Sequence, residues 1–374
     1  MSKVATIAII TNIPAPYRVD LFYYLQNNVK EYDWHIIYTG RNEDDREWKI
    51  DEGKLINSTI LNAKIIDLKG KMFQRKIHFV LNISKHLDKI NPDIVIAFEY
   101  NMASIQSLIW TKINKRKFVS LTDGTLHSER NISFLQKLSR KIISNYSDAF
   151  IASSTKSKEK LLSWNISASK IFISYLTEDL SEYLKLRTSS KSNVVLYVGS
   201  ICERKGLDLL FKSLSHIDIK YELHIVGSGN EIFVSQLEKQ AQDLGITDNI
   251  VWSGYKEGKD LVNEYANAAC FVLPTREDCF GLVLLEAAAA NLPIVSSKFA
   301  DGIYDIASEN GQNYIFIADP YDETKFSEAI ISALSKKESD IIIRDLTKFE
   351  FPNVSKGYVN AIQYVMSGRS GNEN

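Results

Sequence analysis

Short apolar runs alternate with longer amphipathic stretches along most of the chain. The apolar runs are rich in β-branched residues and about four to eight residues long, which predicts buried strands. In the first half of the chain they span 4–11, 33–38, 64–68, 93–98, 117–122, 149–153 and 170–174. Helical periodicity fills most of the intervals, as in 19–28 and 77–90. Strands that alternate with helices predict a parallel sheet covered on both faces.

A second alternating set follows a polar linker at 188–193. Its predicted strands span 193–198, 222–226, 249–252, 270–273, 293–296 and 313–317. The pattern predicts two doubly wound α/β domains with a central cleft, and ligands at the carboxyl ends of the strands. We expect an N-terminal domain over 1–180, a C-terminal domain over 190–352, a helix over 353–367 that returns to the first domain, and a disordered tail over 368–374.

Composition supports a folded chain of two domains. The 374 residues are 45% hydrophobic, which is enough to bury a large core. No apolar run is long enough to span a bilayer, and the N-terminal run predicts a strand and not a signal peptide. Cys202, Cys270 and Cys279 show no disulfide or metal spacing, which favours a reducing cytoplasm and no metal site.

Charge is distributed unevenly between the two halves. Residues 1–180 hold 26 Lys and Arg against 19 Asp and Glu, whereas residues 181–374 hold 19 against 27. A basic first half favours an anionic partner. A membrane surface or a phosphate-bearing lipid fits better than nucleic acid, because the basic residues are dispersed and no aromatic-interleaved recognition motif occurs. The stretch 134–145 has an apolar and a basic side, which is typical of an ordinary amphipathic helix or of a helix on a membrane surface.

Candidate chemistry is concentrated at 270–290, where a predicted strand is followed by an acidic turn and a helix. The first N–H groups of such a helix have no internal partners, so Phe280, Gly281 and Leu282 are candidate donors to a diphosphate. Asp278 and Glu286 are eight residues apart, which places both on one helix face if the helix starts early. In the alternative interpretation, Asp278 caps the helix and Glu286 is a solvated surface residue.

The sequence Asp-Cys-Phe-Gly-Leu-Val-Leu-Leu-Glu resembles the two-glutamate signature of the family-four retaining glycosyltransferases, which have the GT-B fold. In that family the first carboxylate lies beside the transferred sugar and the second binds the ribose of the nucleotide. The resemblance implies the sugar role for Asp278, which stands in place of Glu, and the ribose role for Glu286. The Pro-Ala-Pro-Tyr-Arg opening at 14–18 also resembles members that build bacterial surface polysaccharides, which implies a role in making lipopolysaccharide or capsule.

Two further landmarks lie in the predicted second domain. Gly199, Ser200, Arg204 and Lys205 follow its first strand, and the resemblance implies that they bind the donor diphosphate. Two adjacent cations can neutralise such a group, although a basic pair in a loop is more often solvated. The resemblance also places Ser253, Gly254 and Tyr255 beside the nucleotide base.

Candidate residues of the first domain follow its first and fifth strands. Pro16, Tyr17 and Arg18 resemble an acceptor-binding opening, although Pro16 is equally suited to starting a helix. Asp123 stands where the family usually has a His near the transferred sugar, and His127 follows four residues later. Both are candidate catalytic residues, but Asp-Gly is also an ordinary turn signal.

The resemblance implies a cytoplasmic, peripheral-membrane enzyme that transfers a sugar from a UDP- or GDP-sugar to a lipid-linked, polysaccharide or other glycan acceptor. Neither a cofactor nor a metal ion is expected, because Arg204, Lys205 and helix amides can stabilise the leaving diphosphate. Two alternatives remain open from the sequence. One is a sugar-nucleotide epimerase of the same fold, and the other is a non-enzymatic nucleotide-binding protein.

Overall fold

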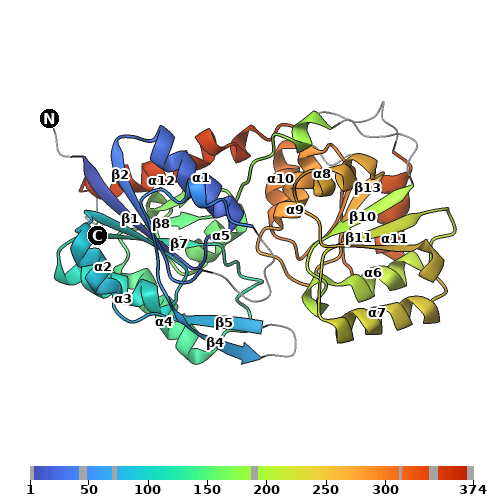
Figure 1. Cartoon of the computed structure of the whole chain (residues 1–374), viewed down its shortest axis with the longest axis horizontal. Helices are drawn as coiled ribbons and strands as arrows, with labels where there is room; N and C mark the ends of the chain where they lie inside the picture. The colour runs from blue at the N-terminus through green and yellow to red at the C-terminus, as the bar shows by residue number, and fades with distance from the viewer. Residues whose placement is uncertain are drawn as a thin grey trace. The chain divides into compact units, whose positions relative to one another are not determined.

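The computed structural model describes residues 4–41, 49–69, 74–186, 193–310, 314–336 and 344–368. The chain divides into two compact units, of which the first comprises Met1–Glu178 and Thr347–Asn374 and the second Asp179–Leu346 (Figure 1). The second unit therefore begins before the expected residue 190 and ends before the expected residue 352. Apart from Asn193, the expected linker lies outside the described residues, as does the expected tail from residue 369 onward.

Parallel strands form the core of the first unit. Within the described residues its main sheet has seven strands in the order β3-β2-β1-β6-β7-β8-β9. They are β1 (Ala5–Thr11), β2 (Tyr32–Tyr38), β3 (Ser58–Ile60), β6 (Ile94–Phe98), β7 (Lys117–Thr122), β8 (Ala149–Ala152) and β9 (Ile171–Ile173). Alternate residues of β1 enter two separate apolar clusters, Ile7 and Ile9 one of them and Ala8 and Ile10 the other. The central strand β6 is apolar throughout, as is typical of a strand in a sheet that is covered on both faces.

One predicted strand lies outside this sheet. β4 (Lys64–Lys69) pairs antiparallel with β5 (Gln74–Phe79) in a separate two-stranded sheet. The helix expected over 77–90 is therefore wrong in its first part, and α2 runs only over Ile83–Ile90. Sequence analysis also missed β3, because three residues are too few to show a strand period.

The final helix of the chain belongs to the first unit. Besides α2, the first unit contains the helices α1 (Pro16–Asn28), α3 (Met102–Ile113), α4 (Phe134–Tyr146) and α5 (Thr155–Ser163). α12 (Phe351–Met366), red in Figure 1, contacts α1, β8 and β9. Its buried stripe includes Val354, Tyr358 and Ile362 at helical spacing. Each such side chain stabilises the docked helix by about 1.5–3 kcal/mol.

The second unit contains one parallel sheet. Within the described residues its six strands have the order β12-β11-β10-β13-β14-β15. They are β10 (Val194–Val198), β11 (Glu222–Val226), β12 (Ile250–Gly254), β13 (Cys270–Leu273), β14 (Ile294–Ser297) and β15 (Ile315–Ala318). The helices are α6 (Leu207–Leu214), α7 (Glu231–Asp243), α8 (Gly258–Asn267), α9 (Leu282–Ala289), α10 (Gly302–Asn310) and α11 (Glu323–Leu334). The predicted class of two doubly wound α/β domains is confirmed.

Each sheet reverses its strand order at one point, and this positions the candidate sites. In the first sheet β2 and β6 flank β1, and in the second β11 and β13 flank β10. At such a reversal the loops after the two neighbouring strands diverge, which leaves room for a ligand at their carboxyl ends. Ligand sites are therefore expected at the loops after β1 and β6 and at those after β10 and β13. Across the described residues, no helix combines the length and apolar character needed to cross a membrane.

Candidate active site

The site of the second unit is built from the loops after β10 and β13. The first loop contains the short turn Glu203–Lys205, and the second covers 274–281. Hydrogen bonds join the two loops. The Arg276 N–H donates to the Arg204 carbonyl at 2.8 Å, and the Arg204 guanidinium donates to the Glu277 carbonyl at 2.9 Å. These bonds hold the basic pair of the first loop against the acidic turn of the second.

Gly206 has a packing reason to follow Lys205. Its φ is +77°, and a Cβ there would lie 2.2 Å from the Pro274 carbonyl oxygen. Any side chain would force the two loops apart, so only glycine lets the turn rest on the exit of β13. The Lys-Gly pair recognised in the sequence is therefore required by the close approach of the two loops.

Two cations surround one carboxylate between these loops. Lys205 Nζ lies 2.6 Å from Asp278 Oδ2, and a guanidinium nitrogen of Arg204 lies 3.8 Å from the same oxygen. Burial by itself raises the pKa of the Asp278 carboxyl, but the charges of Lys205 and Arg204 outweigh it and hold the pKa below its usual value. With all three groups ionised, the cluster has one net positive charge. An anion beside it would complete its neutralisation.

The backbone of Asp278 is fixed by the segment after β14. The Asp278 N–H donates to the Phe299 carbonyl at 3.0 Å, and the Asp278 carbonyl accepts from the Asp301 N–H at 2.9 Å. Sequence analysis did not select this segment. The available signal was Asp301-Gly302 between β14 and α10, which repeats the strand-to-helix pattern of the acidic turn.

α9 begins at Leu282, two residues later than expected. Asp278 therefore lies outside the helix, and the argument that helical spacing aligns it with Glu286 is wrong. The Phe280 N–H donates to Asp278 Oδ1 at 3.3 Å, so Asp278 supports the turn before the helix. The N-cap is Gly281, so the alternative of Asp278 as a helix cap is also wrong. In the described part of the chain, the N–H groups of Gly281 and Leu282 have no acceptor. They are the two of the three expected amides that remain available to an anion.

Glu286 is buried, with 7% of its surface exposed. The Tyr265 hydroxyl on α8 donates to Glu286 Oε2, and the Tyr265 ring stacks on Phe271 of β13. The alternative of a solvated surface residue is therefore wrong. Tyr265 was missed in the sequence, where nothing distinguishes it from other aromatic residues of an amphipathic helix.

The remaining candidates of the second unit lie at the same edge of its sheet. The Gly199 N–H donates to the Val226 carbonyl at 3.0 Å, and the Gly227 N–H donates to the Gly254 carbonyl at 2.8 Å. The loops after β10, β11 and β12 are thereby connected in series. Ser200 is exposed, Ser253 is partly exposed and Tyr255 is 38% exposed, so these side chains are accessible to a ligand.

In the first unit, Arg18 is a buried brace. Its NH2 donates to both carboxylate oxygens of Asp123, at 2.9 and 2.7 Å, and its guanidinium lies 4.2 Å from the centre of the Phe98 ring. Burial lowers the pKa of Arg18, but the Asp123 charge more than compensates and raises it. The side chain is only 4% exposed, so the geometry favours support of Asp123 over the expected contact with an acceptor. Pro16 starts α1, while Pro16 and Tyr17 stay partly exposed.

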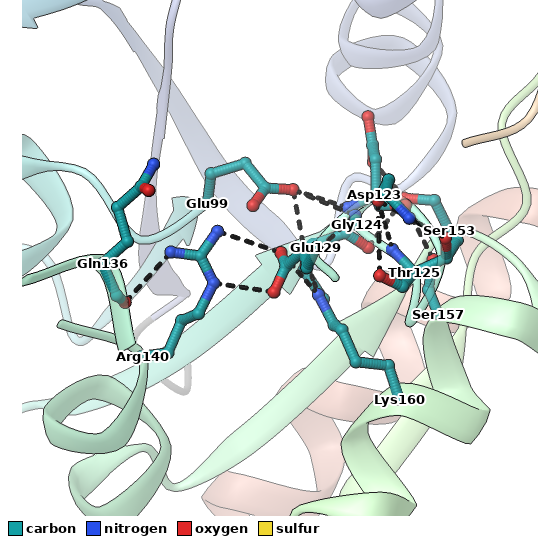
Figure 2. Close-up of polar contacts among 12 residues, drawn as sticks. Glu99, Asp123, Gly124, Thr125, Glu129, Gln136, Arg140, Ser153, Ser157 and Lys160 are labelled. Carbon is teal, nitrogen blue, oxygen red and sulfur yellow. Dashed lines mark hydrogen bonds and ion pairs between the residues drawn. The ribbon is translucent and has the colours of Figure 1, made fainter. Parts of the chain in front are cut away.

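Asp123 is held from several sides at the end of β7. Its carboxylate also accepts from the Ser153 hydroxyl, and its carbonyl accepts from the Ser157 hydroxyl at 2.9 Å (Figure 2). The Asp123 side chain retains 15% exposure. His127 is partly exposed in the turn after it, and its carbonyl accepts from Arg130.

Sequence analysis missed a network of charges that surrounds the end of β7. Glu99, which follows β6, accepts from the Asp123 N–H at 2.7 Å and from Thr122 Oγ1 at 3.1 Å. Its φ of +60° is uncommon for a residue with a side chain and indicates local strain. Burial raises the pKa of its carboxyl, and the charge of Lys160 offsets this only in part.

Glu129 links this network to two helices. Arg140 of α4 donates to both of its oxygens, at 2.7 and 3.1 Å, and Lys160 of α5 donates to Oε1 at 3.1 Å (Figure 2). Burial by itself raises the pKa of the Glu129 carboxyl, but the hydrogen bonds and charges of Arg140 and Lys160 outweigh it. The pKa therefore lies below its usual value. Burial likewise lowers the pKa of Lys160, and the surrounding Tyr100, Glu99 and Glu129 raise it overall. The ammonium is thus kept charged although it is fully buried.

Among the described residues, no group of three or more His, Cys, Asp or Glu is arranged to hold a metal ion. Both clusters supply fixed charges and hydrogen bonds. One cluster, within the loops expected to bind the donor, places two cations around one carboxylate. The other places three cations and three carboxyl groups around the end of β7.

Comparison with known proteins identifies the class. Residues 184–345 match the family model described as "Glycosyl transferases group 1". The chain is 26% identical over 296 residues to a lipopolysaccharide 1,6-galactosyltransferase of Salmonella typhimurium, covering 78% of this chain and 80% of that protein. It is 24% identical over 272 residues to the O-antigen chain mannosyltransferase RfbU of the same organism, covering 68% and 74%.

Solved structures show the same architecture over the whole chain. The lipopolysaccharide outer core galactosyltransferase WaaB in its apo form matches with a TM-score of 0.72 and 20% identity, covering 96% of this chain and 99% of that one. Anabaena Alr3699/HepE in complex with UDP also matches with a TM-score of 0.72, at 14% identity and the same coverage. Residues 184–345 thus match the group 1 glycosyltransferase model, the chain has the GT-B fold of these structures, and the expected resemblance is confirmed.

Proposed function

We propose that this glycosyltransferase moves a sugar from a UDP- or GDP-sugar to a lipid-linked, polysaccharide or other glycan acceptor, with retention of the anomeric configuration. The bond between the anomeric carbon and the diphosphate oxygen breaks, and a bond to an acceptor oxygen forms as that hydroxyl loses its proton. The proposal draws support from relatives that are named for transfer to lipopolysaccharide and O-antigen, and from neighbours named as complexes with UDP and UDP-glucose.

The observation that carries the proposal is the excess of positive charge around Asp278. Lys205 and Arg204 share one carboxylate, so a diphosphate can enter as the missing counter-charge without a metal ion. As the diphosphate leaves, its growing charge would be stabilised by both cations and by the Gly281 and Leu282 amides. We assign orientation of the donor sugar to Asp278 and the ribose contact to Glu286.

The deciding experiment is incubation with a panel of nucleotide-sugars, with and without candidate glycan acceptors. We expect release of the nucleoside diphosphate only when an acceptor is present, together with a product of unchanged anomeric configuration by NMR. A new free sugar nucleotide without acceptor would instead show an epimerase. Binding without turnover across the panel would show a nucleotide-binding protein.

The same assay, run with EDTA, tests whether turnover needs a metal ion. We expect turnover to survive EDTA, because protein charges take the part that a cation plays elsewhere. Complete loss on chelation that manganese or magnesium restores would overturn metal independence, while leaving the transfer reaction in place. We further assign the enzyme to the cytoplasmic face of the plasma membrane, because its first 180 residues carry a basic excess. Fractionation of the native cells tests this location.

A further inference from the structure

A cavity of about 510 Å³ lies in the first unit beside α4 and α5. None of the residues assigned above to donor, ribose or acceptor contacts lines it. Its charged lining consists of five basic side chains and one acidic side chain, namely Arg130, Lys137, Arg140, Lys141, Lys160 and Glu129. A concave site with one sign of charge concentrates ligands of the opposite sign.

The single carboxylate of the cavity is already neutralised. Arg140 and Lys160 both donate to Glu129, as described above. Lys137 and Lys141 are exposed on α4, and in the described part of the chain neither side chain has an ion-pair partner. These two lysines are therefore available to an anion.

The hydroxyl of Ser144, in the same wall of the cavity, supports the interpretation that the cavity binds an anion. Ser144 follows Lys137 and Lys141 along α4, at positions that share one helix face. Ser144 belongs to the lining of the cavity, and its Oγ is buried and has no hydrogen-bond partner among the described residues. Buried polar atoms are nearly always paired, so a ligand oxygen is the natural partner for this hydroxyl.

The neighbouring face of α4 is apolar and exposed. Phe134 is 78% exposed, Leu135 74% and Leu138 43%, and Leu126 in the cavity wall is 53% exposed. An ordinary amphipathic helix buries its apolar side, but here only Ile143 is fully buried, with Ile142 packed against the same cluster. The core therefore does not account for the first turn of the helix. An anion with an attached hydrocarbon chain accounts for both the charge and the apolar face.

We propose that this cavity binds the phosphate group of a lipid, whose acyl chains lie along Phe134, Leu135 and Leu138. Lys137 and Lys141 pair with the phosphate oxygens, and Ser144 donates to one of them. Lipid binding at this cavity can be measured without a nucleotide-sugar donor, so the proposal does not depend on the transfer reaction. It gives the basic first unit a defined point of attachment in place of a diffuse attraction to negative charge.

The test uses the full chain and two forms of phosphate lipid. Binding is measured to phosphatidylglycerol vesicles by sedimentation and to monomeric dihexanoyl phosphatidate by calorimetry. The first variant is Lys137→Glu/Lys141→Glu, and its matched control is Lys85→Glu/Lys89→Glu, which changes the same charge at the same spacing on exposed positions of α2. We expect the first pair to weaken binding about tenfold or more and the control pair to change it less than threefold.

Two uncharged variants separate the cavity from general surface attraction. Asn145→Trp places a large side chain at an exposed position of the cavity lining, and should abolish phosphatidate binding without changing the net charge. Phe134→Ser/Leu138→Ser should weaken vesicle binding, whereas Ile109→Ser/Ile113→Ser on the exposed side of α3 should not. Thermal unfolding confirms that each variant is folded.

Three results would overturn the proposal. One is equal loss of binding in the Lys85/Lys89 control, which would show that only net charge matters. The second is unchanged phosphatidate binding in Asn145→Trp, which would place the ligand elsewhere. The third is inorganic phosphate binding as tightly as dihexanoyl phosphatidate, which would show a site for free phosphate. Turnover with a soluble acceptor is measured separately, so a failure here does not bear on sugar transfer.

Discussion

The two units use buried charge in opposite ways. Around Asp123 in the first unit, Arg18, Arg140 and Lys160 accompany Glu99, Asp123 and Glu129, so three cations accompany three carboxyl groups. Around Asp278 in the second unit, two cations share one carboxylate. A balanced network holds its members rigidly and attracts little, whereas an unbalanced one is completed by a ligand. The comparison thus separates a structural frame from a binding site by counting charges within each cluster.

The largest effect is expected from breaking the balanced network. Lys160→Met removes a fully buried ammonium and leaves Glu129 with one cation fewer, which should destabilise the protein by about 3–5 kcal/mol. The control is Lys158→Met on the same helix, where the side chain is partly exposed and has no ion-pair partner among the described residues. Urea unfolding measures both. Similar stability of the two variants would show that the network does not act as a frame.

The unbalanced cluster should respond in activity and not in stability. Lys205→Ala and Arg204→Ala each remove one of the two positive charges that we expect to bind the diphosphate. Each should cost about 2–4 kcal/mol of transition-state stabilisation, measured as a lower kcat/KM. Lys239→Ala on the exposed face of α7 is the control and should leave kcat/KM unchanged. Wild-type turnover in both site variants would show that the diphosphate binds elsewhere.

A substitution of Asp278 separates its effect on the charge of the cluster from a direct role in orienting the donor sugar. Asp278→Asn releases Lys205 and Arg204 from their shared partner, so donor affinity should be kept or improved. If the carboxylate also orients the sugar in the transition state, kcat should still fall on the order of 100-fold. Glu277→Gln changes the preceding carboxylate and should have little effect. The reverse pattern would mean that the motif is displaced by one residue and that Asp278 only supports the turn.

Glu286 should show a smaller effect, confined to binding. Its contact with ribose would exist before and during the reaction. Glu286→Gln should therefore weaken nucleotide binding by about 1.5 kcal/mol, which raises both KM and the Kd for the nucleotide and leaves kcat unchanged. Tyr265→Phe removes the hydroxyl that holds Glu286 and should raise Kd in the same direction. A fall in kcat without a change in Kd would contradict the ribose assignment.

The contrast between the clusters also explains what the sequence could reveal. The acidic turn and the Arg-Lys-Gly turn are local, because each follows a strand in a fixed register, and both were found. Lys160 could not be found, because it ends the run Thr-Lys-Ser-Lys-Glu-Lys and only packing decides which lysine is buried. Glu99 was equally hidden, since its partners are more than twenty residues away and its positive φ depends on them. The β4–β5 hairpin was misread because 77–79 continue a helical period into α2.

A third cluster, around His224 in the second unit, allows the balance to be switched by pH. His224 on β11 lies 2.6 Å from a Glu222 oxygen and 2.9 Å from a Glu264 oxygen, and Lys256 also pairs with Glu264. With His224 protonated, two cations accompany two carboxylates, and with His224 neutral one negative charge is left over. Burial lowers the pKa of His224, but the two glutamates outweigh it and raise the pKa overall.

The direction of the pH effect follows from this raised pKa. A group whose pKa is higher in the folded state stabilises that state fully below its unfolded pKa, about 6.5 for histidine, and loses this contribution as the pH rises through the folded value. Wild type should therefore exceed His224→Gln in unfolding free energy by about 1 kcal/mol at pH 5.5, with the difference shrinking toward pH 9. Glu264, whose pKa is lowered by Lys256 and His224 against the effect of burial, stays ionised over this whole range. Urea unfolding at intervals of half a pH unit measures the difference, with Glu222→Gln as the partner variant that should reduce its size. A difference that is constant or grows with pH would mean that charge balance does not set stability even here, and the division between frame and binding site drawn from it would fall.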